Sequence, residues 1–313
     1  MLKRLFFPVL FAITIILSGC SYSDMVSDGK LQIVTTIFPA YDFARQVFGD
    51  TAEVTLLLKP GMESHSYDPS ARDIVKIESC DLFIYNGGES DVWVDNILKS
   101  TKNVNALRMM DAVEALEEDH EGIAENDEHD HDHEEDEYDE HIWTSPKNAA
   151  LIIYDIYRAA ISLAPQNKEL YKNAGEEYIA DITDLDGKFS ELLSGEKRYF
   201  VFGDRFPLLY FFREYGLNYY AAFPGCGSET EPSAQTVAFL IEKLSEEDTV
   251  KTVFFIELSN HKLADTLAAE NGLPTAEFHT CHNITADDFA AGESYVSLME
   301  RNYQMLKSVL NGG

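Results

Sequence analysis

The stretch KELYKNAGEEYIADITDLDGKFSELL, residues 168–193, has the most regular hydrophobic pattern in the chain. Its apolar positions recur every three or four residues, which places them on one face of a helix. They are Leu170, Ala174, Tyr178, Ile182, Leu185, Phe189 and Leu192. Pro165 precedes the stretch and Ser194-Gly195 follows it, as is typical of the two ends of a helix. A helix of this length spans about 39 Å, so the pattern predicts a rigid spine that connects two lobes.

On both sides of this helix, short apolar strands alternate with helical stretches. The expected strands are 31–36, 52–58 and 81–85 before the helix, and 198–203, 219–223, 253–257 and 275–279 after it. The expected shorter helices are 38–48, 70–78, 208–215, 233–244, 261–271 and 294–310. Such alternation favours βαβ units and mostly parallel sheets. We therefore predict an α/β protein with an N-terminal lobe at 30–166, a linking helix at 167–195 and a C-terminal lobe at 196–313.

The first twenty residues, MLKRLFFPVLFAITIILSGC, have the pattern of an export signal. Two basic residues precede an apolar run that is too short to span a bilayer comfortably. Leu17-Ser18-Gly19 directly before Cys20 resembles a bacterial lipobox, which implies cleavage before Cys20 and lipid attachment to its thiol. Residues 21–29 would then be a polar tether. We expect a protein that faces outside the cytoplasm and is held at the cell membrane by lipid alone; the alternative is an ordinary signal peptide.

Three cysteines remain beyond the lipobox: Cys80, Cys226 and Cys281. Export permits disulfides. Cys226 and Cys281 both lie at loop-like positions in the C-terminal half, so we expect these two to pair. Cys80 precedes an apolar strand and is expected to be a buried small hydrophobe.

Acidic residues dominate the charge of the chain. Its 313 residues include 55 acidic and 24 basic side chains, a net charge of −31, which excludes nucleic acid as a plausible partner. Almost half of the excess lies in residues 117–140, where no Lys or Arg occurs. That composition predicts a disordered, solvated loop. Its histidines stand beside carboxylates and add weak metal sites at His120, His129, His131 and His133.

Two histidines outside this acidic insert occupy positions that suit a ligand. His65 follows the second expected strand and a Pro60-Gly61 turn, which places it at the carboxyl edge of a parallel sheet, where open α/β sheets bind ligands. His141 begins an apolar stretch in which Ile142 and Trp143 are expected to hold the backbone in the protein. For each histidine the alternative is a solvated side chain without a ligand role.

Several short motifs together resemble a known family. They are, in chain order, Thr35-Thr36-Ile37-Phe38-Pro39 with Tyr41-Asp42, Pro60-Gly61 with His65 and Asp68-Pro69-Ser70, the acidic insert, Asp139-Glu140-His141-Ile142-Trp143 with Ser145-Pro146, Arg213-Glu214-Tyr215-Gly216-Leu217, Glu231-Pro232-Ser233 and Phe254-Phe255-Ile256-Glu257. In this order, behind a lipobox, they resemble the substrate-binding lipoproteins of bacterial zinc and manganese ABC importers, the ZnuA/TroA-like receptors. The resemblance implies two bridged α/β lobes with one metal in the cleft between them. It also implies an ABC permease and its ATPase as partners.

The resemblance implies two metal ligands from each lobe. His65 and His141 match the pair from the N-terminal lobe, with Glu63 as a further candidate. The third ligand is usually a His or Glu at the position that Arg205 occupies here, and a permanently protonated arginine cannot be a ligand. We therefore expect the neighbouring Asp204 to substitute; the alternative is that Asp204 caps the following helix.

The fourth ligand in the resembled family is usually an acid. Counting back from Thr285 places His282 at that position, with His279 as the reserve. A site with three imidazoles and one carboxylate fits Zn²⁺, whereas Mn²⁺ prefers sites richer in oxygen.

The predicted function is therefore binding without catalysis. We expect a monomeric receptor outside the cytoplasm that captures Zn²⁺ and delivers it to a membrane permease. The alternatives are a Mn²⁺ receptor of the same kind and a surface lipoprotein for zinc storage or adhesion. A zinc hydrolase is disfavoured, because four protein ligands would fill the tetrahedron and the sequence has no His-Glu-x-x-His motif or nucleophile elbow.

Overall fold

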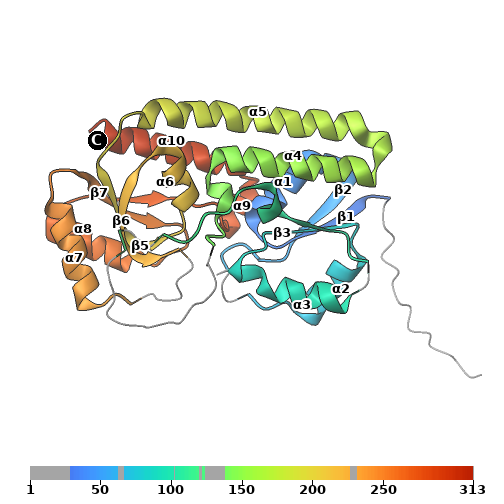
Figure 1. Ribbon diagram of the computed structural model, residues 1–313, viewed down its shortest axis with the longest axis horizontal. Coiled ribbons are helices and arrows are strands. Elements are labelled where there is room, and N and C mark those ends of the chain that lie inside the picture. The colour runs from blue at the N-terminus through green and yellow to red at the C-terminus, as the bar shows by residue number, and fades with distance from the viewer. Residues whose placement is uncertain are drawn as a thin grey trace, which may run out of the picture.

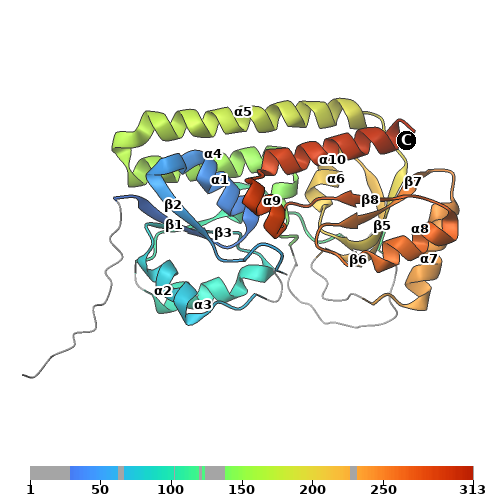
Figure 2. The same cartoon turned by 180° about the vertical axis from the view of Figure 1, so that it is seen from behind.

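The computed structural model describes residues 29–62, 67–101, 103–119, 122–123, 138–225 and 231–312. Within these ranges the chain forms two α/β lobes beside one another, with a long helix running along both (Figures 1 and 2). The predicted fold class is confirmed. None of the helices in the described ranges combines the length and the apolar character needed to cross a membrane.

The N-terminal lobe is built on a four-stranded parallel sheet of order β2-β1-β3-β4. Its strands are β1 (Leu31–Thr35), β2 (Ala52–Leu56), β3 (Leu82–Tyr85) and β4 (Ala106–Arg108). Its helices are α1 (Phe38–Phe48), α2 (Ala71–Ser79), α3 (Val92–Ser100) and α4 (Pro146–Leu163). Helices α2 and α3 cover one face of the sheet, and α1 and α4 cover the other (Figure 1). The sequence did not reveal β4, because its three residues are only partly buried and form no apolar run.

The C-terminal lobe repeats this plan with a parallel sheet of order β6-β5-β7-β8. Its strands are β5 (Tyr199–Phe206), β6 (Asn218–Pro224), β7 (Thr249–Ile256) and β8 (Thr275–Phe278). Its helices are α6 (Leu209–Tyr215), α7 (Ala234–Ser245), α8 (Lys262–Asn271), α9 (Ala286–Ala291) and α10 (Tyr295–Leu310). Strand β7 begins four residues before the expected start, because Lys251 interrupts the apolar pattern but not the strand.

Short 3-10 turns complete the described elements. They are η1 (Gly49–Thr51), η2 (Glu89–Asp91), η3 (Met109–Ala112), η4 (Ile142–Thr144) and η5 (Pro165–Asn167).

The long helix α5 (Lys168–Leu193) has the bounds that the sequence predicted. It packs on α1 and α4 over the N-terminal lobe and on α6 and α10 over the C-terminal lobe (Figure 1). One predicted core position is wrong: Leu170 is 53% exposed, and the adjacent Tyr171 is buried in its place. Close packing requires a glycine at position 175, because a Cβ there would lie 2.5 Å from the ring of Tyr157.

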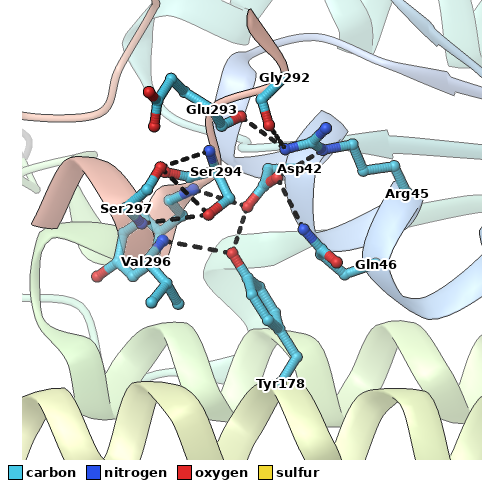
Figure 3. Close-up of polar contacts among 10 residues, drawn as sticks. Asp42, Arg45, Gln46, Tyr178, Gly292, Glu293, Ser294, Val296 and Ser297 are labelled. Carbon is cyan, nitrogen blue, oxygen red and sulfur yellow. Dashed lines mark hydrogen bonds and ion pairs between the residues drawn. The ribbon is translucent and has the colours of Figure 1, made fainter. Parts of the chain in front are cut away.

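A buried carboxylate joins three helices at the boundary between the lobes (Figure 3). Asp42 of α1 has no exposed surface. Its Oδ2 accepts hydrogen bonds from the hydroxyl of Tyr178 on α5 (2.5 Å) and from the backbone N–H of Tyr295 on α10 (2.8 Å). Its Oδ1 lies 2.7 Å from Nε of Arg45, which also donates to two backbone carbonyls between α9 and α10. Asp42 thereby ties the N-terminal lobe to the long helix α5 and to the start of α10.

We expect Tyr178→Phe to lower the free energy of unfolding by about 1–3 kcal/mol, because a buried charged acceptor loses one of its donors. Burial, together with the charge and hydrogen bond of Asp42, raises the pKa of Tyr178, so the hydroxyl stays protonated as a donor. Chemical denaturation measures the change. Tyr154→Phe on the exposed side of α4 is the matched control; equal stability of the two variants would contradict this role of Asp42.

The chain that enters the acidic insert crosses from the N-terminal to the C-terminal lobe. The carboxylate of Asp119 pairs with Arg213 of α6, and its carbonyl accepts from the hydroxyl of Tyr219 (3.1 Å). The carbonyl of Gly122 then accepts from the backbone N–H of Ala221 in β6 (3.0 Å), the strand at the edge of the sheet. This corrects the prediction of disorder for the described residues of 117–140: Glu117 and Tyr138, at the two ends, pair with each other, and Ile123 pairs with Ala221 of β6.

Only glycine fits at the point where the insert touches β6. Gly122 has φ of +91°, and a Cβ there would lie 2.4 Å from the carbonyl oxygen of Tyr219. We expect Gly122→Ala to detach this contact and to speed hydrogen exchange of the Ala221 amide by roughly tenfold or more. Gly187→Ala is the control, because a Cβ at that α5 position meets nothing within 4 Å. Unchanged protection of Ala221 in the Gly122 variant would show that the contact is not held in solution.

Candidate metal centre

A small cavity of about 40 Å³ lies where the two lobes meet. Met62 and His141 of the N-terminal lobe line it together with Arg205, Glu257 and His282 of the C-terminal lobe. The ring centroids of His141 and His282 are 5.3 Å apart, with the ring planes at 76°. Two imidazoles that are far apart in sequence therefore converge on one cavity between the lobes.

His141 is held by a carboxylate of its own segment. The side chain is 1% exposed, and its Nδ1 lies 3.2 Å from Oδ1 of Asp139, which also accepts from the His141 backbone N–H at 2.7 Å. A carboxylate at Nδ1 favours the tautomer with the proton on that nitrogen, which leaves the Nε2 lone pair for a metal. Burial acts to lower the pKa of His141, but the charges of Asp139 and Glu140 outweigh it and raise this pKa.

Trp143 fixes the spacing of the two imidazoles. Its ring is fully buried and makes edge contacts with His141 (5.5 Å between centroids) and His282 (4.9 Å). Its Nε1 donates to the carbonyl of Thr280 in the other lobe (2.9 Å), and its own carbonyl accepts from the hydroxyl of Tyr295 (2.8 Å). The expectation that this apolar stretch anchors His141 is confirmed.

Glu257 positions the loop that carries His282, a role that sequence reasoning missed. It directly follows β7, and its buried carboxylate accepts from the backbone N–H of Thr280 (2.7 Å), from the Thr280 hydroxyl (2.6 Å) and from the backbone N–H of His282 (3.2 Å). The only signal in the sequence was an acid at the end of an apolar strand.

The same loop is attached to the N-terminal lobe next to the predicted ligands of that lobe. The side-chain amide of Asn283 donates to the carbonyls of Lys59 (3.0 Å) and Met62 (2.6 Å). Met62 lines the cavity and is the last described residue before the segment that holds Glu63 and His65. Both predicted ligands lie outside the described residues, so their roles stay predictions.

Asp204 and His279 do not line the cavity between the two imidazoles. Asp204 lines a neighbouring cavity of about 570 Å³, and its carboxylate accepts from the backbone N–H groups of Arg205 (2.8 Å) and Ile256 (3.3 Å). Burial raises the pKa of Asp204. His279 is buried, and its Nδ1 accepts from the backbone N–H of Cys281 (2.9 Å). The structure thus brings His141 and His282 together at one cavity. Asp204 and His279 lie outside the lining of that cavity, and their ligand roles stay predictions.

The comparison with known proteins agrees with this geometry. A family model described as zinc-uptake complex component A, periplasmic (ZnuA), matches residues 33–309. The chain belongs to this family. The resemblance seen in the sequence motifs is confirmed, and the family is one of metal-binding transport receptors, not a family of enzymes.

Relatives of the ZnuA family match nearly the whole chain. The high-affinity zinc uptake system protein ZnuA of Bacillus subtilis is 34% identical over 287 residues, which cover 90% of this chain and 88% of that protein. The zinc-binding lipoprotein AdcA of Streptococcus pneumoniae is 33% identical over 299 residues. That match covers 93% of this chain but 58% of AdcA, so the chain spans little more than half the length of that relative.

A solved structure of the family has the same architecture. The Zn(II)-bound ZnuA-like domain of Streptococcus pneumoniae AdcA superposes with a TM-score of 0.75 at 31% identity. The match covers 91% of this chain and all of that domain.

The remaining predicted sites can be placed only in part. Cys281 is fully buried and has no disulfide partner among the described residues, and burial raises the pKa of its thiol; its expected partner Cys226 lies outside those residues, so the pairing stays a prediction. Cys80 is a half-buried free thiol, and burial raises its pKa to about 11. Predicted sites that lie outside the described residues also include Cys20, His120, His129, His131 and His133.

We expect Asp139→Asn to lower the pKa of His141 in the metal-free protein. The charge and hydrogen bond of the carboxylate raise this pKa against the effect of burial. Without them, the imidazole should stay neutral down to a lower pH. Titration of the His141 ring by NMR measures the shift. Asp184→Asn on the exposed side of α5 is the matched control. The account fails here if both variants titrate like the wild type.

Proposed function

We propose that the protein is a receptor that captures Zn²⁺ between its lobes and delivers it to an ABC permease and its ATPase. The observation that carries this proposal is the convergence of His141 and His282, one from each lobe, on a single cavity where the lobes meet. The names of the relatives support the same cargo, because they are zinc-binding and zinc-uptake proteins. Neutral imidazoles favour Zn²⁺ over Mn²⁺, which prefers oxygen ligands.

We infer that His65 supplies a third imidazole from the segment after Met62. In the described ranges no group of three or more His, Cys, Asp or Glu side chains is arranged to hold a metal. A metal at His141 and His282 therefore needs a further donor. Met62, the last described residue before His65, lines the same cavity. The Asp139 carboxylate acts behind His141 as the group that orients the ring.

We take the site to bind its metal without catalysis. A hydrolytic zinc site needs a general base that activates the metal-bound water. The two carboxylates nearest the imidazoles are Asp139, which holds His141, and Glu257, whose oxygens hold the Thr280–His282 loop. Both carboxylates already accept hydrogen bonds from the protein, which supports a binding role over a role as general base.

The proposed place of work is the outer face of the cell membrane. The lipobox-like sequence before Cys20 supports lipid anchoring, and the streptococcal relative is named a lipoprotein. With residues 21–29 as the tether, the lobes would stand close to the membrane, where a permease can receive the ion.

Zinc binding by single-histidine variants tests the proposal. We expect the protein without residues 1–20 to hold one tightly bound zinc. His141→Ala or His282→Ala should each lower the affinity for zinc at least tenfold, about 1.4 kcal/mol. Competition against a zinc chelator measures the affinity. His261→Ala is the control, because this side chain is about half exposed and does not line the cavity between His141 and His282. An unchanged affinity in either cavity variant would remove that residue from the site.

A further inference from the structure

We propose that Tyr210 on helix α6 is a positioning residue for the metal site, because its hydroxyl fixes the backbone of Asp139, whose carboxylate orients His141. The inference rests on the proposed function, since it concerns how one of the two imidazoles is set for the metal. Helix α6 belongs to the C-terminal lobe (Figure 1), whereas His141 belongs to the N-terminal lobe. Tyr210 would therefore let one lobe act on a ligand of the other.

The Tyr210 hydroxyl joins the two chain segments that enter and leave the acidic insert. It accepts a hydrogen bond from the backbone N–H of Leu116 (2.9 Å) and donates one to the carbonyl of Asp139 (2.8 Å). The backbone N–H of Asp139 donates to the carbonyl of Leu116 (2.9 Å), and Glu117 and Tyr138 form an antiparallel bridge beside them. Both backbone polar groups of Asp139 are therefore bonded, one of them to the buried hydroxyl of α6.

The fixed backbone of Asp139 sets the direction of its carboxylate. Oδ1 accepts from the backbone N–H of His141 (2.7 Å) and lies 3.2 Å from Nδ1 of the same ring. Both residues are buried, and hydrogen bonds in such surroundings are stronger than in water. A displacement of Asp139 by about 0.5 Å would end the contact with Nδ1, because side-chain contacts beyond about 3.6 Å are no longer hydrogen bonds. The tautomer of His141 is thus sensitive to small movements of Asp139.

The next residue of this segment is held by the N-terminal lobe. The carbonyl of Glu140 accepts from the side-chain amide of Asn86 (2.8 Å). Its carboxylate accepts from the backbone N–H of Ser90 (2.9 Å) and from the Ser90 hydroxyl. Asp139 is thus bonded to α6 and Glu140 to the loop after β3, so the ring of His141 depends on contacts with both lobes.

This arrangement couples the contact between the lobes to zinc binding. With Asp139 held by α6, the imidazole of His141 is set for the metal before the metal arrives. By linkage, a zinc ion on His141 strengthens the bonds at Tyr210 by the same free energy. A group bonded directly to a metal-bound histidine typically contributes a factor of about 10–100 to metal affinity. Tyr210 acts one residue further away, so we expect a smaller factor, roughly fivefold.

The tautomer of His141 in the metal-free, full-length chain tests the positioning role without zinc. In alkaline solution, where the imidazole is neutral, we expect ring-nitrogen NMR to show the proton on Nδ1 in the wild type. In Tyr210→Phe this form should give way to a mixture with the Nε2 form, because Asp139 is no longer held. Tyr215→Phe is the matched control and should keep the wild-type tautomer. It removes a hydroxyl from the same helix, but one that bonds to Asp186 of α5 (2.8 Å).

Zinc affinity in a double-mutant cycle shows whether Tyr210 acts through Asp139. We expect Tyr210→Phe alone to lower the affinity roughly fivefold, and Asp139→Asn alone to lower it about tenfold or more. With Asp139→Asn already present, Tyr210→Phe should change the affinity by less than about twofold, because the path to His141 is already interrupted. If Tyr210 only stabilised the fold, the two effects would be independent and would multiply.

A measurement on the wild type keeps the test decisive even if Tyr210→Phe fails to fold, which thermal unfolding would show. Zinc should slow hydrogen exchange of the Leu116 amide, which donates to Tyr210, more than that of the Leu217 amide after α6. Equal slowing of the two amides, an unchanged tautomer in Tyr210→Phe or multiplying effects in the cycle would overturn the positioning role. Absence of tight zinc binding by the wild type would overturn the receptor function instead, and the tautomer would still decide the role of Tyr210.

Discussion

The buried carboxylate of Asp42 is the interaction on which the placement of the site depends. A buried charge is costly unless it is paired, and Asp42 is paired with donors from α1, α5 and the start of α10. These bonds hold the start of α10 against α1 of the N-terminal lobe. The loop before α9 is bonded to the same lobe through Asn283 and the carbonyl of His282. The segment from His282 to Tyr295 is therefore fixed to the N-terminal lobe at both ends, although it follows strand β8 of the C-terminal lobe.

This crossing explains how a site can be assembled from two lobes without a shared sheet. Helix α9 lies between the lobes in both views (Figures 1 and 2), and Phe289 on it packs against Tyr41 of α1 at 5.2 Å between centroids. Trp143 fills the space behind the two imidazoles and bonds to the opposite lobe. The two imidazoles that we propose as ligands are thus held by the protein without a metal, which limits the entropy that binding must offset. Asp119 in the described part of the insert pairs with α6 of the C-terminal lobe, and the carbonyl of Glu140 accepts from the side-chain amide of Asn86 in the N-terminal lobe.

Sequence reasoning succeeded where an apolar pattern was long or where apolar residues directly flanked the residue in question. The bounds of α5 followed from a one-sided apolar pattern over many turns, and the burial of His141 followed from the apolar residues after it. It failed where the signal was short or depended on tertiary contacts. Strand β4 is too short and too exposed to form a pattern.

The direction of a side chain at the end of a strand was also beyond the sequence. Asp204 and Arg205 are neighbours, and only the register shift in β5 and the bond to Ile256 decide which of them lines the cavity between the imidazoles. The role of Glu257 depends on a loop more than twenty residues away, so no local motif could reveal it. The described ends of the insert were misjudged because a composition typical of disorder hid the backbone contacts at Glu117, Gly122 and Tyr138.

The central claim is that one zinc ion binds between the lobes at His141 and His282. A crystal structure of the protein loaded with one equivalent of zinc tests it most directly. The account predicts a single zinc with one ring nitrogen of each histidine at about 2.0–2.1 Å. Zinc held by the histidines of the acidic insert, with the imidazoles of His141 and His282 unliganded, would contradict it.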